Sequence, residues 1–403
     1  LWTGITDLKA LANTGTYTIT AVANSLAIAG TLNGVAFTTN ATDANATATE
    51  AAVLVAGVVT ALSGFTATSA GAVVSVTADT TKVIEFGALT GGATAATFAY
   101  PDVSFTDAAG TETLTINAGD KVTYSLKDAS GSDDVAKVNI TPLSGDTKFN
   151  QTIGDLTIAN TETLQLGVTG LDDDNTYTLS NVSGDASLTT LNITGDSNFT
   201  LIDHASDNSK LATIDASTFT NDLTFSDAVA TLAQTLTTGT GNDTWNMSAG
   251  TLTEDDVIDL AGNTALANGT AGTDTVAHTG NLGTAVDAAA LQIKNVETIN
   301  LTATGGVTGA IATYIDASKM SGNGTLAFAS GSGTAKITNL DTTTKIGLGI
   351  AANDFTGTLN VALADETGTD DSISLVESSS LTAASAITFK STGIETLNIE
   401  TPT

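Results

Sequence analysis

The sequence predicts a mainly β protein in which a small α+β module, residues 1–100, precedes a repetitive parallel β-solenoid. Residues 1–100 contain one long stretch of helix-forming residues. From residue 101 onward, short β-patterned segments are instead separated by Gly, Asn, Asp and Ser. Several of these segments recur along the chain, which is typical of stacked repeats. Tandem β-sandwiches are the alternative, because a strand spacing of about 8–12 residues suits them as well.

The first hundred residues predict a ββαβ-like arrangement. Residues 16–22, "TYTITAV", alternate as a strand does, and residues 25–39 predict two strands around an Asn33-Gly34 turn. Residues 46–62 are rich in Ala and Leu and contain Gly57 as their one turn residue before the closing Ser-Gly. We therefore expect them to form the longest helix of the chain. Residues 72–79 predict a further strand.

A pair of motifs appears three times after residue 130. An Asp that precedes one strand-like segment is followed by a Glu that precedes another, as in "GSDDVAKVNI" and "NTETLQL". The separations are 28, 23 and 24 residues for the pairs Asp134 and Glu162, Asp274 and Glu297, and Asp371 and Glu395. Each unit would supply strands that cannot bury an apolar face alone, so neighbouring units would stack and bury it together.

A second unit recurs at residues 213–228, 314–331 and, in degenerate form, 350–365. Together the repeats suggest a first β-repeat region at residues 101–270 and a second at residues 271–403. Pro101, one of three prolines, marks the boundary with the module.

Charge and composition exclude several classes of partner. The chain has 403 residues and a net charge of -31, its 12 basic residues are all lysines, and it has no cysteine. Nucleic acid is therefore excluded, because phosphate binding needs clustered Lys and Arg. Insertion into a membrane is not expected, since the longest apolar run, residues 51–62, is too short to span a bilayer. The start at Leu1 suggests a fragment of a longer protein.

The Gly-Thr-Asp turns, the "ETLNI" strands and the "IDAS…GTL" units resemble bacterial surface-layer proteins. The similarity is to the kind that type I secretion exports and that is related to the RTX calcium-binding proteins, as in Caulobacter and Campylobacter. It covers roughly residues 130–403, and residues 367–400 are the most similar stretch. The resemblance implies an extracellular protein at the cell surface that self-associates into a two-dimensional lattice and binds Ca²⁺. A cell-surface glycan such as lipopolysaccharide would bind through a region outside this fragment.

Acidic turns are the candidate calcium ligands. Calcium takes about six to eight oxygen ligands from carboxylates and backbone carbonyls on loops. The candidates are Asp134, Asp172, Asp174, Asn242, Asp243, Asp255, Asp256, Asp259, Asp274, Asp371, Glu162, Glu297 and Glu395. The simpler interpretation is that the Asp residues bond the local backbone of ordinary turns. The three Glu residues are either ligands or solvated residues at strand starts.

The stretch "TGTGNDTWNM", residues 238–247, predicts a calcium turn that leads into a strand. It is a solitary, imperfect copy of the RTX nonapeptide, which normally occurs in tandem. Gly239 and Gly241 are expected to adopt left-handed backbone angles. In the strand that follows, Trp245 and Met247 are expected to point to one face and Thr244 and Asn246 to the other.

A structural role is the preferred function, that of a lattice subunit stabilised by calcium, and no catalytic residue is expected. A secreted RTX-type adhesin or surface-binding module is the alternative. An enzyme that acts on polysaccharides from a β-helix is a weaker one, because a chain without arginine lacks the natural partner for an acidic sugar. His204 lies beside Asp203, but the chain has neither a Gly-x-Ser-x-Gly elbow nor an HExxH motif.

Overall fold

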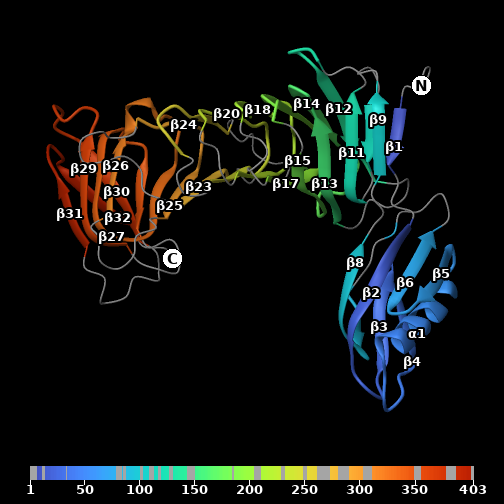
Figure 1. Ribbon diagram of the computed structural model, residues 1–403. Helices are drawn as coiled ribbons and strands as arrows, with labels where there is room; N and C mark the ends of the chain where they lie inside the picture. The colour runs from blue at the N-terminus through green and yellow to red at the C-terminus, as the bar shows by residue number, and fades with distance from the viewer. Residues whose placement is uncertain are drawn as a thin grey trace.

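A computed structural model of the chain shows a mainly β protein with a parallel β-solenoid of about eight turns and a small α+β module before it. The module lies to one side of the N-terminal end of the solenoid (Figure 1). The structure describes residues 7–10, 14–32, 34–78, 84, 88–99, 103–108, 113–116, 119–126, 130–142, 150–183, 186–203, 210–227, 232–247, 252–260, 273–279, 290–302, 311–348, 355–377 and 387–400.

The module packs one helix against antiparallel strands. A four-stranded sheet has the order β5-β6-β2-β8 and a three-stranded sheet the order β4-β3-β7. The bounds are β2 (Thr14–Val22), β3 (Ala27–Leu32), β4 (Val35–Ala41), α1 (Ala48–Thr60), β5 (Phe65–Ala70), β6 (Val73–Ala78), β7 (Thr90–Gly91) and β8 (Ala93–Ala99). The predicted hairpin is confirmed, because Leu32 of β3 pairs with Val35 of β4 and Gly34 has a φ of 70°.

The predicted helix at residues 46–62 is also confirmed. With 13 residues, α1 is the longest helix in the described part of the chain. It begins after Thr47, whose side chain accepts a hydrogen bond from the Glu50 amide at 3.2 Å, as a helix N-cap does. Ala52, Val55 and Val59 are buried against the strands, so small and β-branched residues allow close packing here.

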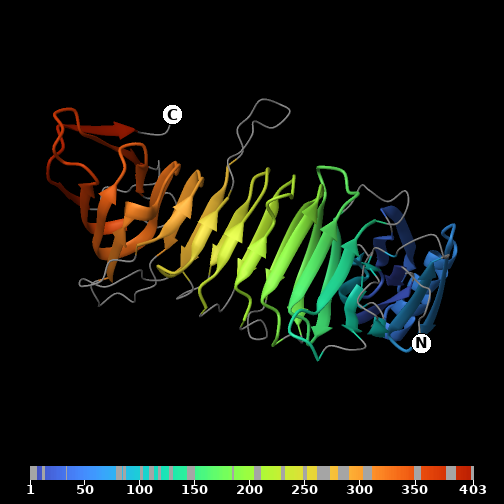
Figure 2. The same cartoon turned by 90° about the horizontal axis from the view of Figure 1, so that it is seen from above.

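Two parallel sheets form the walls of the solenoid (Figure 1), and Figure 2 looks down on its successive parallel strands. The first has nine strands, in the order β1 (Asp7–Ala10), β10 (Thr113–Ile116), β12 (Val135–Ile140), β14 (Thr163–Val168), β16 (Thr190–Gly195), β18 (Thr213–Asp215), β20 (Thr235–Thr237), β22 (Val257–Asp259) and β24 (Gln292–Lys294). Strand β1 thus precedes the module in sequence but pairs with β10 of the solenoid.

The second sheet has sixteen strands. Its main path contains β9 (Val103–Ala108), β11 (Gly119–Leu126), β13 (Gln151–Ala159), β15 (Thr176–Ser183), β17 (Asn198–Asp203), β19 (Leu223–Asp227), β21 (Thr244–Met247), β23 (Thr275–Thr279), β25 (Thr298–Thr302), β27 (Thr325–Leu340), β28 (Lys345–Leu348), β30 (Ser372–Glu377) and β32 (Thr396–Glu400). These strands pair in parallel with the next strand of the same sheet, which excludes tandem sandwiches of antiparallel strands.

The solenoid forks at β27, whose 16 residues serve two sets of neighbours. Its first part pairs with β25 and β28. Its second part pairs with β26 (Ile311–Asp316) and β29 (Phe355–Leu363), and β29 pairs in turn with β31 (Ile387–Ser391). A 3-10 helix, η1 (Ala317–Lys319), follows β26.

One hydrophobic core fills the space between the sheets. Side chains alternate between this core and the outer face, as the pleat of a strand requires. In the nine-stranded sheet the residues Leu114, Val138, Leu166 and Ile193 pair in register and are all buried. Each coil therefore covers the apolar face of the next coil, which is the stacking that the repeats predict.

Candidate functional site

The acidic turns are the segments that end in Asp134, Asp243, Asp274 and Asp371. Each of these Asp residues immediately precedes a strand: β12, β21, β23 and β30, respectively. Asp243 and Asp274 are 1 % and 0 % exposed, whereas Asp134 and Asp371 are half-buried. The turns therefore lie where the chain enters a wall of the solenoid, rather than on protruding loops.

The repeated Asp and Glu residues are neighbours across one coil. The amides of Asp134, Asp274 and Asp371 donate to the Oε2 atoms of Glu162, Glu297 and Glu395 at 2.9, 2.8 and 2.9 Å. The backbone carbonyl of each Asp also accepts from the strand of the coil that holds the Glu, for example from the Thr298 amide at 3.0 Å. The 23- to 28-residue separation in the sequence is thus one solenoid turn, and each Glu satisfies a backbone donor.

Around Asp243 these contacts form a ladder over four coils. The Leu223 amide donates to Asp243 Oδ1 at 2.9 Å, and the Asp243 amide donates to Asp274 Oδ1 at 2.7 Å. The Asp274 amide then donates to Glu297, as described above. Buried amides at the strand starts would otherwise lose the hydrogen bonds that water provides in the unfolded chain, so the carboxylates stabilise the corner.

In three of the acidic turns, one carboxylate oxygen lacks a well-placed hydrogen-bond donor. The Oδ2 atoms of Asp134, Asp243 and Asp371 are buried and make no well-formed hydrogen bond to the described residues, although the Thr238 side chain lies near enough to Asp243 to lower the pKa of that carboxyl. A buried oxygen acceptor without a donor is costly unless a cation or another donor approaches it. Each of these oxygens belongs to an Asp directly before a strand, and the three are the best-supported cation ligands of the predicted set.

Burial raises the pKa of Asp243 from 3.8 to about 6, and the charge of Asp222 adds to this rise. The Thr238 side chain and the Leu223 amide act in the opposite direction. The ionised carboxylate is therefore poorly compensated by the protein itself. A cation at the unpartnered oxygen would favour the ionised form.

The stretch at residues 238–247 forms the expected turn and strand. Trp245 and Met247 are buried, and Thr244 and Asn246 lie on the other face of β21. Gly241 has a φ of 149°, as the left-handed prediction requires. The prediction for Gly239 was wrong, because its φ lies outside that region. Gly239 is needed for a close approach instead, since a Cβ atom there would lie 1.9 Å from the Phe219 carbonyl oxygen.

The other predicted ligands are scattered. Asp172 and Asp174 are exposed in the loop before β15, and Asp255 is exposed before β22. Asp256 is buried and accepts from the Gln234 amide at 2.8 Å and the Thr253 amide at 2.6 Å, so it closes a turn. Asp259 accepts from Asn295 Nδ2 at 2.7 Å. Asn242 accepts from the Thr273 amide at 2.8 Å.

The described residues contain no group of three or more His, Cys, Asp or Glu side chains arranged to hold a metal ion. Within this part of the chain, a cation at an acidic turn would therefore be held by one or two carboxylates with backbone carbonyls and water. His204 lies outside the described residues.

Sequence reasoning missed Asp222, which belongs to the same corner. Its Oδ1 atom accepts from the Asn242 amide at 2.7 Å and from Asn242 Nδ2 at 3.1 Å. Asp222 precedes β19 as Asp243 precedes β21, and both follow an Asn. This shared Asn-Asp pair before a strand was the signal that could have identified it.

No family model, curated protein or solved structure matches the chain. Among the described residues, no helix has the length and apolar character needed to cross a membrane.

Replacing Asp243 with asparagine is expected to stabilise the calcium-free protein at neutral pH. A carboxyl group whose folded pKa is raised favours the folded state at low pH, and this contribution is lost as the pH rises through about 6. Asparagine keeps the acceptor for Leu223 without the charge. The stability difference between variant and parent should therefore shift by about 2 kcal/mol in favour of the variant between about pH 4.5 and about pH 7.5.

Urea unfolding in EGTA at the two pH values measures this shift. Asp43→Asn, at an exposed turn of the module, removes the same charge and should show no such shift. A destabilisation of equal size at both pH values would contradict the raised pKa of Asp243.

Replacing Glu297 with alanine is expected to destabilise the protein by about 1–3 kcal/mol, because the buried Asp274 amide loses its acceptor. Glu297→Gln keeps an acceptor oxygen at the same place and should cost less than about 1 kcal/mol. Urea unfolding of both variants, with hydrogen exchange at the Asp274 amide, measures the difference. Equal losses for the two variants would show that the charge of Glu297, not its acceptor oxygen, stabilises the corner.

Proposed function

We propose that the chain is a structural subunit of a cell-surface layer, in which the solenoid is a stiff element and calcium binds at the acidic turns. The observation that carries this proposal is the buried, unpartnered Oδ2 atom found at Asp134, Asp243 and Asp371. These oxygens recur along a solenoid with one continuous core, so one kind of cation site would recur along a rod. The resemblance of the repeats to RTX-related surface-layer proteins supports the same function.

Charge explains why such a rod needs cations. The chain carries a net charge of -31, and stacked coils bring its carboxylates together. Asp243 lies near Asp222, whose charge already raises the Asp243 pKa. Bound calcium would supply positive charge at these turns. The Asp134, Asp243 and Asp371 side chains would each provide one oxygen, and neighbouring carbonyls and water would complete the shell.

Self-association would follow from reduced repulsion between subunits. Two copies with a net charge of -31 repel each other until cations neutralise part of that charge. We propose that the chain is extracellular, assembles into a two-dimensional lattice, and has no catalytic role. A secreted adhesin with the same solenoid would bind calcium equally well but would stay monomeric.

Negative-stain microscopy of the purified chain tests this proposal. With calcium we expect ordered two-dimensional sheets, and after addition of EGTA we expect dispersed particles. Magnesium at the same concentration is the matched control, because it keeps the ionic strength but prefers a smaller octahedral site. Dispersed monomers in every condition would contradict the lattice and favour the adhesin.

Hydrogen exchange with and without EGTA tests the calcium part separately. Binding to the folded state alone adds stability by mass action. Chelation should therefore reduce protection in residues 130–403 more than in residues 1–100. Equal protection in both regions under both conditions would contradict calcium binding at the acidic turns.

A further inference from the structure

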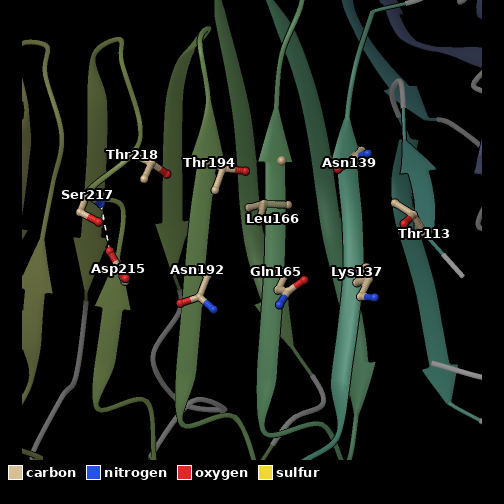
Figure 3. A pocket seen from close by; sticks show the side chains of 11 residues that line it. Thr113, Lys137, Asn139, Gln165, Leu166, Asn192, Thr194, Asp215, Ser217 and Thr218 are labelled. Carbon is tan, nitrogen blue, oxygen red and sulfur yellow. Dashed lines mark hydrogen bonds between the residues drawn. The ribbon is translucent and has the colours of Figure 1, made fainter. Parts of the chain in front are cut away.

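A groove crosses the outer face of the nine-stranded sheet. Its volume is about 480 Å³, and it is lined by residues of β10, β12, β14, β16 and the end of β18. Because these strands are successive neighbours in the sheet, the groove runs along the solenoid axis and across the strands (Figure 3). It lies on the face opposite the hydrophobic core.

Most of the residues that line the groove form two rows, and within each row neighbouring residues are in register. One row is Thr113, Lys137, Gln165, Asn192 and Asp215, with one residue from each successive strand. The other row places Asn139, Gly167 and Thr194 side by side, two residues further along the same strands. Neighbouring strands lie about 4.8 Å apart, so each row offers a polar group at that interval.

At the middle of the groove, Gly167 lets the Asn139 side chain lie close to the backbone of β14. A Cβ atom at this position would lie 2.4 Å from the Asn139 Oδ1 atom and 3.9 Å from Thr194 Oγ1. The Asn139 Oδ1 atom therefore occupies the space that a side chain would take at Gly167. Its backbone angles do not demand glycine, because φ lies outside the left-handed region, so local conformation does not account for the glycine here.

The amide side chains of the groove form no hydrogen bonds with the described part of the protein. Gln165, Asn192 and Asn139 make no side-chain hydrogen bond with any described residue, and Figure 3 shows them directed away from the core. The interaction drawn within the groove is the Ser217 amide donating to Asp215 Oδ1 at 3.0 Å. Each free amide can donate and accept at once, which suits a ligand whose own groups do both.

Charge narrows the class of ligand. The groove has one lysine, Lys137, and one carboxylate, Asp215, and these lie on different strands. A polyanion would meet a chain with a net charge of -31 and a single cation in the groove, so it is disfavoured. A metal ion is disfavoured as well, because the sole carboxylate already accepts from Ser217 and no other anion lines the groove.

From these features we infer that the groove binds a neutral, linear oligosaccharide that lies along the solenoid axis. Sugar hydroxyls both donate and accept hydrogen bonds, as the amides and hydroxyls of the groove do. An extended glycan repeats along its length at an interval similar to the strand spacing, so successive sugars can meet successive strands. This inference does not depend on lattice formation or on calcium.

Titration calorimetry with the intact chain tests the inference. The probes are cellohexaose, mannohexaose and laminarihexaose as neutral hexasaccharides, and hexagalacturonate as the anionic counterpart. We expect at least one neutral probe to bind with a Kd of about 1 mM or tighter, and the anionic probe to bind more weakly. Absence of binding by all neutral probes, or tighter binding of hexagalacturonate, would overturn the inference.

Two variants assign the binding to the groove. Gly167→Thr places a side chain that suits a strand at the centre of the groove, where it displaces the Asn139 side chain, and it should abolish detectable binding. Gln165→Ala combined with Asn192→Ala removes amides that make no internal hydrogen bond, so folding should be unaffected and affinity should fall about tenfold. Asn360→Ala, on the separate face formed by β27, β29 and β31, is the matched control and should bind as the parent does.

Thermal unfolding confirms that each variant keeps the fold. Unchanged affinity in the folded double variant would place the glycan elsewhere on the molecule and overturn the inference. Sheet formation in the microscope has no bearing on this result, so the lattice proposal and the groove can fail independently.

Discussion

Replacing Trp245 with alanine is expected to lower the free energy of unfolding by about 4 kcal/mol. The indole is fully buried and lies in β21, in register with Phe225 of β19 and Val276 of β23. Its ring centroid is 6.3 Å from that of Phe225. Truncation would leave a cavity at the interface of three consecutive coils, and a solenoid coil has only its two neighbours to compensate for the loss.

Trp245→Phe is the informative comparison. The indole Nε1 atom is buried and has no hydrogen-bond partner among the described residues. Phenylalanine removes that unsatisfied donor while it keeps most of the apolar volume, so the loss should be below about 2 kcal/mol. Urea unfolding followed by circular dichroism measures both variants. A loss as large for phenylalanine as for alanine would indicate that the Nε1 atom donates a stabilising hydrogen bond.

Acidification is expected to destabilise the protein through His278 by about 2.5 kcal/mol between about pH 7.5 and about pH 4.5. Burial lowers the pKa of His278 from 6.5 to about 4. The side chain is 1 % exposed and pairs in register with Met247 and Leu301, both buried, and neither ring nitrogen has a partner among the described residues. Because the unfolded chain takes up the proton first, stability is full above about pH 6.5 and falls as the pH drops toward about 4.

His278→Leu should remove this pH dependence, since leucine suits a core position between Met247 and Leu301. The variant should gain about 2.5 kcal/mol relative to the parent on going from about pH 7.5 to about pH 4.5. Asp243 titrates in the same window with the opposite sign, so the difference between variant and parent at each pH is the quantity to measure. A difference that stays constant with pH would show that His278 is not held neutral in the core.

The repeats favoured the solenoid over tandem sandwiches because they suggested stacked units. Asp134 and Glu162, like the other two pairs, lie one coil apart in the structure, so the recurring separation in the sequence corresponds to one turn. The helix was equally accessible, because the Ala-rich residues 46–62 lack strand alternation. Strands β5, β7 and β8 of the module were missed, and for β7 and β8 the reason is that the residues around Gly91 and Gly92 resemble a loop.

The fork at β27 and the role of the repeated Glu residues could not be derived in the same way. The stretch "GSGTAK" within β27 contains turn residues, and it is paired only because β26 and β29 lie beside it. The Glu side chains accept hydrogen bonds from backbone amides of the neighbouring coil, and this contact depends on how two coils are stacked. The groove could not be predicted for the same reason, since its residues come from five strands that are brought side by side only by the register of the folded sheet.

We propose that calcium binds at the acidic turns through the unpartnered oxygens of Asp134, Asp243 and Asp371. Calorimetric calcium titration of the parent and of the Asp134→Asn, Asp243→Asn, Asp371→Asn triple variant tests it most directly. The matched control replaces the exposed Asp43, Asp196 and Asp365 with asparagine, which changes the net charge equally. We expect the triple variant to lose calcium sites that the control retains. The same calcium stoichiometry and affinity in all three proteins would show that these oxygens do not bind calcium.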